Sequence, residues 1–438
     1  MDPIFNGFSK LSYEERLNIL KKSNFLTADD IQFLKAGGIQ SIELGEKFIE
    51  NTLGYFQLPL GVATHFTIDS KNYLIPMAVE ETSIIAAASK TAKWVNQFGQ
   101  IKTEVIGSDI IGQIQFAKIK SPLDFKDKIL KAKNQLIEMA NKEVAFGLVQ
   151  RGGGVTDIKV RLIDREENLQ NEMTEFMGVV HVLMNPCDAM GANIINQVCE
   201  FLKAPLQELT TEEVTMCILS NLVDTKITRA KITLKGIDPD LAYKIAEASK
   251  FAELDPYRAA TNNKGVLNGM DPIVIATGND WRAVEAGVHA YATRSGQYRS
   301  ITRWTAENDE LVGVLEAPIV VGIVGGVTTL HPMAKMSMRM LNVVSANELS
   351  KVIAAVGLVQ NLGALKALTT VGIIEGHMKL HIKNLSLGAG ATEIEMPFVV
   401  SKLEEILTLR KRITLSNAIE VLNELRSQSK KVLNSVQT

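Results

Sequence analysis

The chain has 438 residues, of which 46% are hydrophobic and 22% charged, and its formal net charge is -2. A chain of this length exceeds one ordinary core, so two domains or one domain with a large insertion is expected. Lys and Arg are scattered without a sustained basic stripe, which argues against nucleic-acid binding. The three cysteines, Cys187, Cys199 and Cys217, lack metal-ligand spacing and fit a reducing compartment, so neither a metal site nor a disulfide framework is expected.

The N-terminus and the apolar runs argue against secretion and membrane insertion. Asp2, Asn6 and Lys10 stand where a signal peptide needs an apolar core. The longest apolar candidate, 315–327, is interrupted by Glu316 and Pro318, and no run reaches the roughly 18 residues of a spanning helix. We therefore expect a cytoplasmic protein without a membrane segment.

Two capping boxes open the chain. Ser12-x-x-Glu15 and Thr27-x-x-Asp30 each precede an apolar periodic set, and each predicts the start of a short helix. Alternating residues around Phe66 predict strands, and a helix of small residues is expected to begin near Glu81.

From about residue 106 the pattern predicts a unit of its own. Strand, helix, two strands, helix and strand follow one another, which is the split βαβ order of a ferredoxin-like domain. The expected elements are 110–119, 125–145, 158–163, 176–183, a helix from the Asp188 turn through Phe201, and 213–222.

The rest of the chain is expected to return to a larger domain. We expect a helix over 241–254, a short strand over 273–276, strands over 311–323 and a helix-rich region from 334 to 377. Strand-like 385–387 and two charged helices, 399–411 and 415–431, close the chain.

Polar residues gather in the segment 257–291. Arg258, Lys264 and Asn268 precede the apolar run 273–276, and Asp280 follows it at the start of a helix. Lys and Asp are seldom buried without a partner, so a lysine on a loop and an aspartate after the next strand are expected to pair. From these residues alone the pair is equally compatible with a structural ion pair and a catalytic cleft.

This segment resembles the catalytic core of 3-hydroxy-3-methylglutaryl-CoA (HMG-CoA) reductases, specifically the soluble bacterial class II enzymes. Four further motifs agree in the same order, and together they cover most of the chain. They are Pro76–Ser83 with Ala86–Ser89, Asp188–Asn193, Gly322–Gly326, and Gln360-Asn361 followed by Gly376-His377-Met378.

The resemblance implies an α+β fold with a large mixed α/β substrate-binding domain. A ferredoxin-like cofactor domain is inserted into it, and a helical flap ends the chain. The implied boundaries are 1–105 and 223–375 for the large domain, 106–222 for the small domain and 376–438 for the flap. No G-x-G-x-x-G opens a βαβ unit, so a Rossmann fold is not expected.

The resemblance also assigns catalytic roles. Lys264 is the cation beside the substrate oxygen on which negative charge grows during hydride transfer, and Asp280 keeps it charged and oriented. Glu81 is the acid that protonates the nascent alkoxide, whereas Glu80 is a neighbour. His377 protonates the departing CoA thiolate, and His381 matches only by spacing.

Substrate recognition is implied at five positions. Arg258 supplies a bidentate partner for the free carboxylate of the hydroxymethylglutaryl group. Ser83, Asn268, Gln360 and Asn361 match family positions that line this pocket. For the two amides of 360 and 361, hydrogen bonds between helices are the alternative.

The cofactor is NADPH or NADH. Asp188, Met190, Gly191 and Asn193 match the nicotinamide-cofactor motif, where a pyrophosphate can approach a helix start, and the alternative is merely an Asp-capped helix. Gly325 and Gly326 belong to a second glycine turn, 322–326, that can bring backbone close to the cofactor, and a mere tight turn is the equally favoured alternative. The position at which NAD-preferring relatives carry an acid aligns with Val144 or Ala145, which favours NADPH, although Glu143 is one residue away.

The implied activity is the four-electron reduction of HMG-CoA to mevalonate with release of CoA, or its reverse. A homodimer with active sites at the subunit boundary is implied, and assembly into a hexamer stays open. Two rival functions remain: a cysteine-dependent, thiolase-like acyl-CoA transferase and a non-catalytic CoA-binding protein. The C-terminal flap is expected to be mobile, with a fixed helical cap as the alternative.

Overall fold

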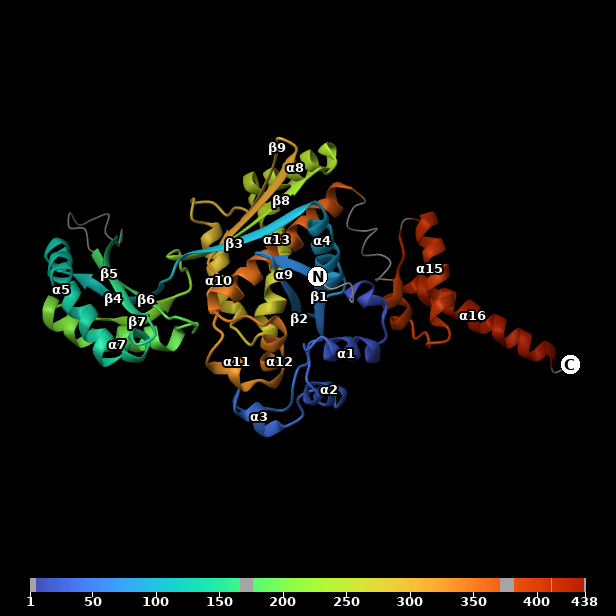
Figure 1. Ribbon diagram of the computed structural model, residues 1–438, viewed down its shortest axis with the longest axis horizontal. Helices are drawn as coiled ribbons and strands as arrows, with labels where there is room; N and C mark the ends of the chain where they lie inside the picture. Colours follow the sequence, from blue (N-terminus) through green and yellow to red (C-terminus); the bar gives the residue numbers. More distant parts are fainter. Residues whose placement is uncertain (1–4, 166–175, 371–381, 411, 437–438) are drawn as a thin grey trace. The chain divides into compact units, whose positions relative to one another are not determined.

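The structure is a computed structural model that describes residues 5–165, 176–370, 382–410 and 412–436 (Figure 1). It is a mixed α/β protein with two compact units. One unit comprises residues 1–80 and 84–363, and the other comprises 81–83 and 364–438.

The N-terminal helices begin where the capping boxes place them. Helix α1 (Tyr13–Lys22) starts after Ser12, whose hydroxyl accepts from the N–H of Glu15, and α2 (Ala28–Lys35) starts after Thr27 in the same way. A 3-10 turn (η2, Phe8–Lys10) precedes them and α3 (Ile42–Glu46) follows. Both predicted helix starts are confirmed.

A six-stranded sheet forms the centre of the first unit, in the order β2-β1-β3-β8-β10-β9 (Figure 1). Only the β1–β3 pair is parallel. Three of its strands, β3, β8 and β9, were not predicted, and the strand expected over 311–323 ends before Pro318. The bounds are β1 Leu60–Ile68, β2 Lys71–Ala78, β3 Gly99–Gly107, β8 Lys226–Lys235, β9 Thr302–Glu307 and β10 Glu310–Ala317.

One prediction in this unit is wrong. Residues 273–276 are the last turn of a long helix, α9 (Pro256–Ala276), not a strand. Their apolar side chains continue a helical set of buried positions that begins at Ala259, and Asp255 caps the helix by accepting from the N–H of Arg258. A short apolar run cannot by itself distinguish a strand from a buried helical turn.

Other helices pack around the sheet. They are α4 (Ile84–Phe98), α8 (Pro239–Leu254), α10 (Trp281–Ala292), α11 (Gly326–Leu330), α12 (Pro332–Leu341) and α13 (Ala346–Thr369). Among the described residues, α13 alone is long and apolar enough to cross a membrane, but most of its apolar window is buried in the protein. It is therefore accounted for as a core helix.

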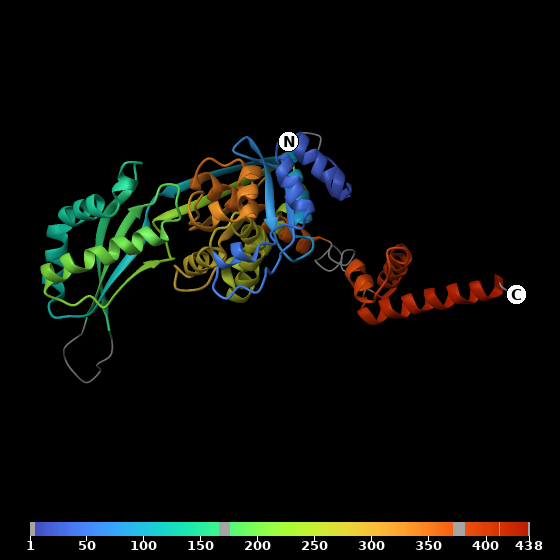
Figure 2. The same cartoon turned by 90° about the horizontal axis from the view of Figure 1, so that it is seen from below.

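A separate four-stranded antiparallel sheet has the order β5-β6-β4-β7. Helices α5 and α7 cover one of its faces and share a core with it that includes Phe116 and Leu202 (Figures 1 and 2). The predicted run of strand, helix, two strands, helix and strand is confirmed. Its elements are β4 Ile110–Ile119, α5 Pro122–Glu143, α6 Phe146–Val149, β5 Gly154–Asp164, β6 Phe176–Asn185, α7 Ala192–Thr210 and β7 Met216–Ser220.

The C-terminal segment has a small core of its own. Helices α15 (Met396–Arg410) and α16 (Leu415–Val436) are the two charged helices that the sequence predicts. Their buried residues include Val399, Leu403 and Leu422. Residues 385–387, expected to be strand-like, are helical, and Leu385 packs against the same core.

Candidate active site

Three turns that are distant in sequence meet in the first unit. They are the 188–193 turn between β6 and α7, the 322–326 turn after β10 and the 277–280 turn after α9. The N–H of Ile323 donates to the carbonyl of Asp188 at 2.9 Å, and the N–H of Gly322 donates to Oδ1 of Asn279 at 2.8 Å. The turns predicted to hold the cofactor are therefore in direct contact.

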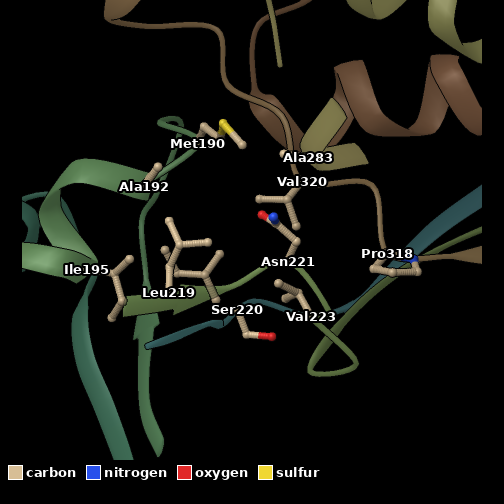
Figure 3. A pocket seen from close by; sticks show the side chains of 11 residues that line it. Met190, Ala192, Ile195, Leu219, Ser220, Asn221, Val223, Ala283, Pro318 and Val320 are labelled. Atoms are coloured by element: carbon tan, nitrogen blue, oxygen red, sulfur yellow. The ribbon is translucent and has the colours of Figure 1, made fainter. Parts of the chain in front are cut away.

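A small open hollow lies beside these turns (Figure 3). Of its lining residues, only Met190 was assigned to the cofactor site by number, although Ala192 lies in the same sequence motif. The others come from the ends of β4 and β7, the start of α7, one residue of α10 and the stretch after β10, elements that the topology brings together. They are Ile110, Ala192, Ile195, Leu219, Ser220, Asn221, Val223, Ala283, Pro318 and Val320.

From the sequence, Asp188 was considered as a possible cap of the following helix, and its local role in the structure is different. It does not cap α7, whose N-cap is Gly191 with no side-chain cap. Instead, Oδ1 of Asp188 accepts from the N–H of Ala346 at the start of α13, at 2.9 Å. The carboxylate thus fastens the 188–193 turn to the large sheet's helices and leaves the first N–H groups of α7 without a side-chain acceptor.

The glycines of the two turns predicted to bind the cofactor, 188–193 and 322–326, fall into two kinds. Gly191 has φ +89°, and a Cβ there would lie 2.5 Å from a side-chain carbon of Ile110. A Cβ on Gly322 would lie 2.5 Å from the backbone N of Met190. These two glycines allow close packing between elements. Gly325 and Gly326 also have positive φ, but a Cβ on either would meet nothing within 4 Å, so their backbone faces open space.

The predicted substrate residues of α9 lie on one side of that helix. Lys264 is exposed and belongs to the helix, which corrects the expectation of a loop. Arg258 is half-buried, and this burial lowers the pKa of its guanidinium. Asn268 is also half-buried. Lys264 and Asn268, four residues apart, lie on one face of the helix, and Arg258 lies about 9 Å along the axis from Lys264, at about 1.5 Å per residue.

Gln360 approaches the same helix from α13. A Cβ on Gly269 would lie 2.8 Å from Cβ of Gln360, so the two helices are in close contact beside Asn268. Gln360 is 8% exposed, and its buried Oε1 has no hydrogen-bond partner among the described residues. A buried amide oxygen without a donor is the condition expected of a group that awaits a ligand hydroxyl.

Asn361 is used differently. Its Oδ1 accepts from the indole N–H of Trp304 at 2.8 Å, and its Nδ2 donates to Asn262 at 2.9 Å. Asn262 in turn donates to Ser300, and Asn263 donates to the carbonyl of Arg299. For Asn361 the structure therefore supports the alternative, hydrogen bonding between packed elements.

The expected Lys264–Asp280 ion pair does not form within one chain. Asp280 caps α10 by accepting from the N–H groups of Arg282 and Ala283, and its carboxylate pairs with the Arg282 guanidinium at 3.2 Å. The α9 axis alone separates Lys264 from Ala276 by about 18 Å, at about 1.5 Å per residue. From the sequence, Lys264 was expected on a loop, whereas the structure places it on helix α9.

The remaining predicted residues belong to the second unit or to its surroundings. Glu81 and Ser83 are grouped with that unit. Ser83 has φ +78°, which is unfavourable for a residue with a side chain, and its buried hydroxyl has no partner among the described residues. His377, Gly376 and the spacing match His381 lie outside the described residues.

Two of the three cysteines are poor nucleophiles. Cys199 is fully buried, and burial raises the pKa of its thiol to about 12. Burial also raises the pKa of Cys217. Since the thiolate is the reactive form, neither thiol suits the cysteine-dependent transfer considered as a rival function.

Two glycine turns in contact beside a hollow, and a set of cationic and amide side chains on α9, are the features expected of a cofactor-dependent enzyme of mixed α/β fold. The sequence profile described as hydroxymethylglutaryl-coenzyme A reductase matches residues 12–382. The chain is 42% identical to the 3-hydroxy-3-methylglutaryl-coenzyme A reductase of Archaeoglobus fulgidus, over 96% of this chain and 94% of that one. It is 33% identical to a probable reductase of the same name from Borreliella burgdorferi, over 77% of each chain.

Solved structures agree. The reductase from Streptococcus pneumoniae matches with a TM-score of 0.79 and 38% identity, over 96% of this chain and 99% of that one. A class II reductase from the same organism, bound to NADPH in open conformations, matches with a TM-score of 0.77 and 37% identity, over 84% of this chain and 100% of that one.

The chain belongs to the hydroxymethylglutaryl-coenzyme A reductase family and, within it, to the class II enzymes. It is accordingly an oxidoreductase that uses a nicotinamide cofactor, as the five sequence motifs predict.

Proposed function

We propose that the chain reduces HMG-CoA to mevalonate and CoA in two hydride steps. Reducing a thioester to an alcohol takes four electrons, and each NAD(P)H delivers two as a hydride. The first hydride gives a hemithioacetal, which releases CoA thiol to leave the aldehyde, and the second hydride gives the alcohol. The observation that carries the proposal is the contact between the 188–193 and 322–326 turns beside the hollow, within a member of this family.

The catalytic roles follow from charge. In both hydride steps negative charge grows on the same substrate oxygen, and Lys264 is the cation that stabilises it. Glu81 returns a proton to that oxygen, and His377 protonates the CoA sulfur as the C–S bond breaks. Arg258 binds the free carboxylate, while Asn268, Gln360 and Ser83 bind the polar groups of the hydroxymethylglutaryl end.

The active site is proposed to be shared between two copies in a homodimer. Lys264 lies in the N-terminal half of α9 and Asp280 follows the C-terminal end of that helix, whereas the family resemblance places the two side chains together in the working site. In a two-fold dimer, Asp280 of one copy can approach Lys264 of the other, with the cofactor turns of the first copy beside the substrate residues of the second. The exposed residues of α9 and the exposed side chains of Leu53 and Phe56 are available for such an interface.

Mixed dimers test this arrangement. Lys264→Met and Asp280→Asn are each expected to be inactive, and Asn keeps the α10 cap. If the two residues come from different copies, co-refolded heterodimers regain one intact site each, and about a quarter of the wild-type turnover returns with random pairing. Mixtures that stay inactive while forming dimers would place both residues in one chain and overturn the shared site.

NADPH is the proposed preferred cofactor. Ala145 is buried, and Lys142 is largely exposed beside Glu143, at 3.8 Å. A lysine there can meet a 2'-phosphate, while its neighbour Glu143 opposes that charge. The S. pneumoniae relative bound to NADPH supports the same preference. Comparing kcat/KM for NADPH and NADH in wild type and in Glu143→Gln tests it, since removal of the acid is expected to raise the NADPH preference.

Residues 376–438 are proposed to act as a flap that brings His377 to the CoA sulfur. The independent core of α15 and α16 supports a separate body. We also propose that residues 1–105 and 223–375 form the large domain and that residues 106–222 form a ferredoxin-like cofactor domain. A cytoplasmic location is proposed as well. His377→Ala is expected to block reduction of HMG-CoA while leaving reduction of added mevaldehyde, because that half-reaction has no thiolate to protonate. Equal loss of both would contradict the role.

One assay separates this function from its rivals. Absorbance of the reduced nicotinamide is followed with HMG-CoA present, in wild type, Lys264→Ala and Cys187→Ser. Oxidation lost only in Lys264→Ala supports the reductase. Cofactor-independent turnover blocked by iodoacetamide would support the thiolase-like transferase, and binding of CoA without turnover would support the non-catalytic protein.

A further inference from the structure

A buried lysine outside the proposed catalytic set lies between the two sheets. Lys226 is the first residue of β8 and is 3% exposed. Among the residues that the structure describes, its ammonium has no hydrogen-bond or ion-pair partner within contact distance. Removing most of the water around a lysine is costly unless nearby charges compensate it.

Lys226 lies where the chain crosses between the sheets. The chain leaves the six-stranded sheet after Gly107 and returns to it at Lys226, and these two residues are paired in register between β3 and β8. A Cβ on Gly107 would collide with the carbonyl oxygen of Thr225, so the two crossings are in contact. Charge placed here therefore acts on the connection between the cofactor turn and the large sheet.

Two carboxylates compensate the lysine. Burial lowers the pKa of Lys226, and the negative charges of Asp188 and Asp109, in that order, oppose this effect. Asp109 is held by the hydroxyls of Ser108 and Thr156, at 2.8 and 2.7 Å. Asp188 is held by the N–H of Ala346 at 2.9 Å. The Lys226 charge and the positive N-terminal end of α13 thus both favour the charged form of the Asp188 carboxylate.

We propose that Lys226 is a positioning residue for the cofactor, acting through Asp188. Its charge keeps the Asp188 carboxylate at the start of α13, and this contact fixes the 188–193 turn against the 322–326 turn. The cofactor side of the hollow, including Met190, is held in place as a result. This inference rests on the proposed cofactor site, whereas Lys226 itself touches neither cofactor nor substrate.

Lys226→Met tests the inference, with Lys231→Met as the matched control because Lys231 is an exposed lysine of the same strand. We expect KM and the dissociation constant for NADPH to rise about ten-fold, which corresponds to about 1.4 kcal/mol, with kcat changed less than about two-fold. Lys231→Met should match wild type. Lys226→Arg, which keeps the charge, should recover most of the affinity.

A double-mutant cycle with Asp188→Asn identifies the route. If Lys226 acts through Asp188, the Lys226→Met effect on NADPH affinity shrinks to less than about two-fold in the Asp188→Asn background. A full ten-fold effect in that background, or loss of kcat with unchanged KM, would overturn the inference. Should Lys226→Met not fold, Lys226→Gln enters the same cycle.

NADPH binding is measured by fluorescence, independently of turnover. A wild type that binds NADPH but does not reduce HMG-CoA contradicts the proposed function alone. An active wild type with unchanged affinity in Lys226→Met contradicts the inference alone.

Discussion

Two sets of polar side chains on helix α9 differ in how the chain uses them. Asn262 and Asn263 are buried, and both amides are hydrogen-bonded to neighbouring elements. Arg258 and Asn268 lie on the partly exposed side, and neither side chain forms a hydrogen bond with the described residues. Amides whose hydrogen bonds are made within the chain hold the helix in place. Polar groups without such hydrogen bonds can recognise a ligand.

Replacing Lys264 should give the largest effect on activity. Lys264→Met is expected to lower kcat by about a thousand-fold. One preorganised donor at a developing oxyanion contributes a factor of about 10²–10³ to kcat. Its exposure predicts a change in unfolding free energy of less than about 1 kcal/mol. Turnover and thermal unfolding are measured on the same preparation, and Lys250→Met on α8 is the control. A large loss of unfolding free energy alongside the loss of turnover would show that Lys264 has a structural role, like the buried Asn262 and Asn263.

The buried set should respond in the opposite way. Asn361→Ala leaves the Trp304 indole N–H and the Asn262 amide without their partners, and we expect it to cost about 2–3 kcal/mol of stability. KM for HMG-CoA should change little in protein that stays folded. Urea unfolding gives the free energy. A normal midpoint combined with a raised KM would instead restore the substrate role first assigned to Asn361.

The sequence distinguished these sets only in part. The five motifs identified the family and placed Arg258, Lys264 and Asn268 together, because each motif is local. Whether Asn361 faces Trp304 or a ligand depends on the packing of α13 against α9 and β9, which no local pattern contains. The hollow residues Ser220, Asn221 and Val320 were missed for the same reason, since the sheet topology alone brings them beside Met190.

The split βαβ unit was predicted well because its strands alternate and its helices are long and amphipathic. Strands β3, β8 and β9 were missed, although they complete the central sheet. The last turn of α9 was predicted as a strand because a four-residue apolar run has no period of its own. Asp188 was considered as a cap at the start of α7. Its carboxylate instead accepts from the N–H of Ala346 at the start of α13, which is 158 residues away in sequence.

Gly322→Ala should separate cofactor binding from substrate binding. The added Cβ would lie 2.5 Å from the backbone N of Met190, so the two cofactor turns must move apart. We expect KM for NADPH to rise about ten-fold, with KM for HMG-CoA within about two-fold of wild type. Gly265→Ala, where a Cβ meets nothing within 4 Å, is the control for adding a methyl group. Equal changes in both KM values would mean that the two sites are not separable.

The smallest effect is expected from a carboxyl pair that belongs to neither set. Asp271 on α9 is partly buried beside Glu285 on α10, and one of its carboxyl oxygens has no partner among the described residues. Burial, followed by the Glu285 charge, raises the pKa of Asp271 to about 8. The raised pKa means that the folded chain holds a proton that the unfolded chain releases near pH 4.

Stability from this group is therefore complete at low pH and is lost as the pH rises toward about 8. Asp271→Asn, which cannot ionise, should flatten that dependence. We expect it to stabilise the protein more at pH 8 than near pH 5, by a difference of at least about 1 kcal/mol. Urea unfolding at both pH values, with Glu285→Gln alongside, measures it. A pH dependence that is unchanged in both variants would show that Asp271 ionises normally in the folded protein.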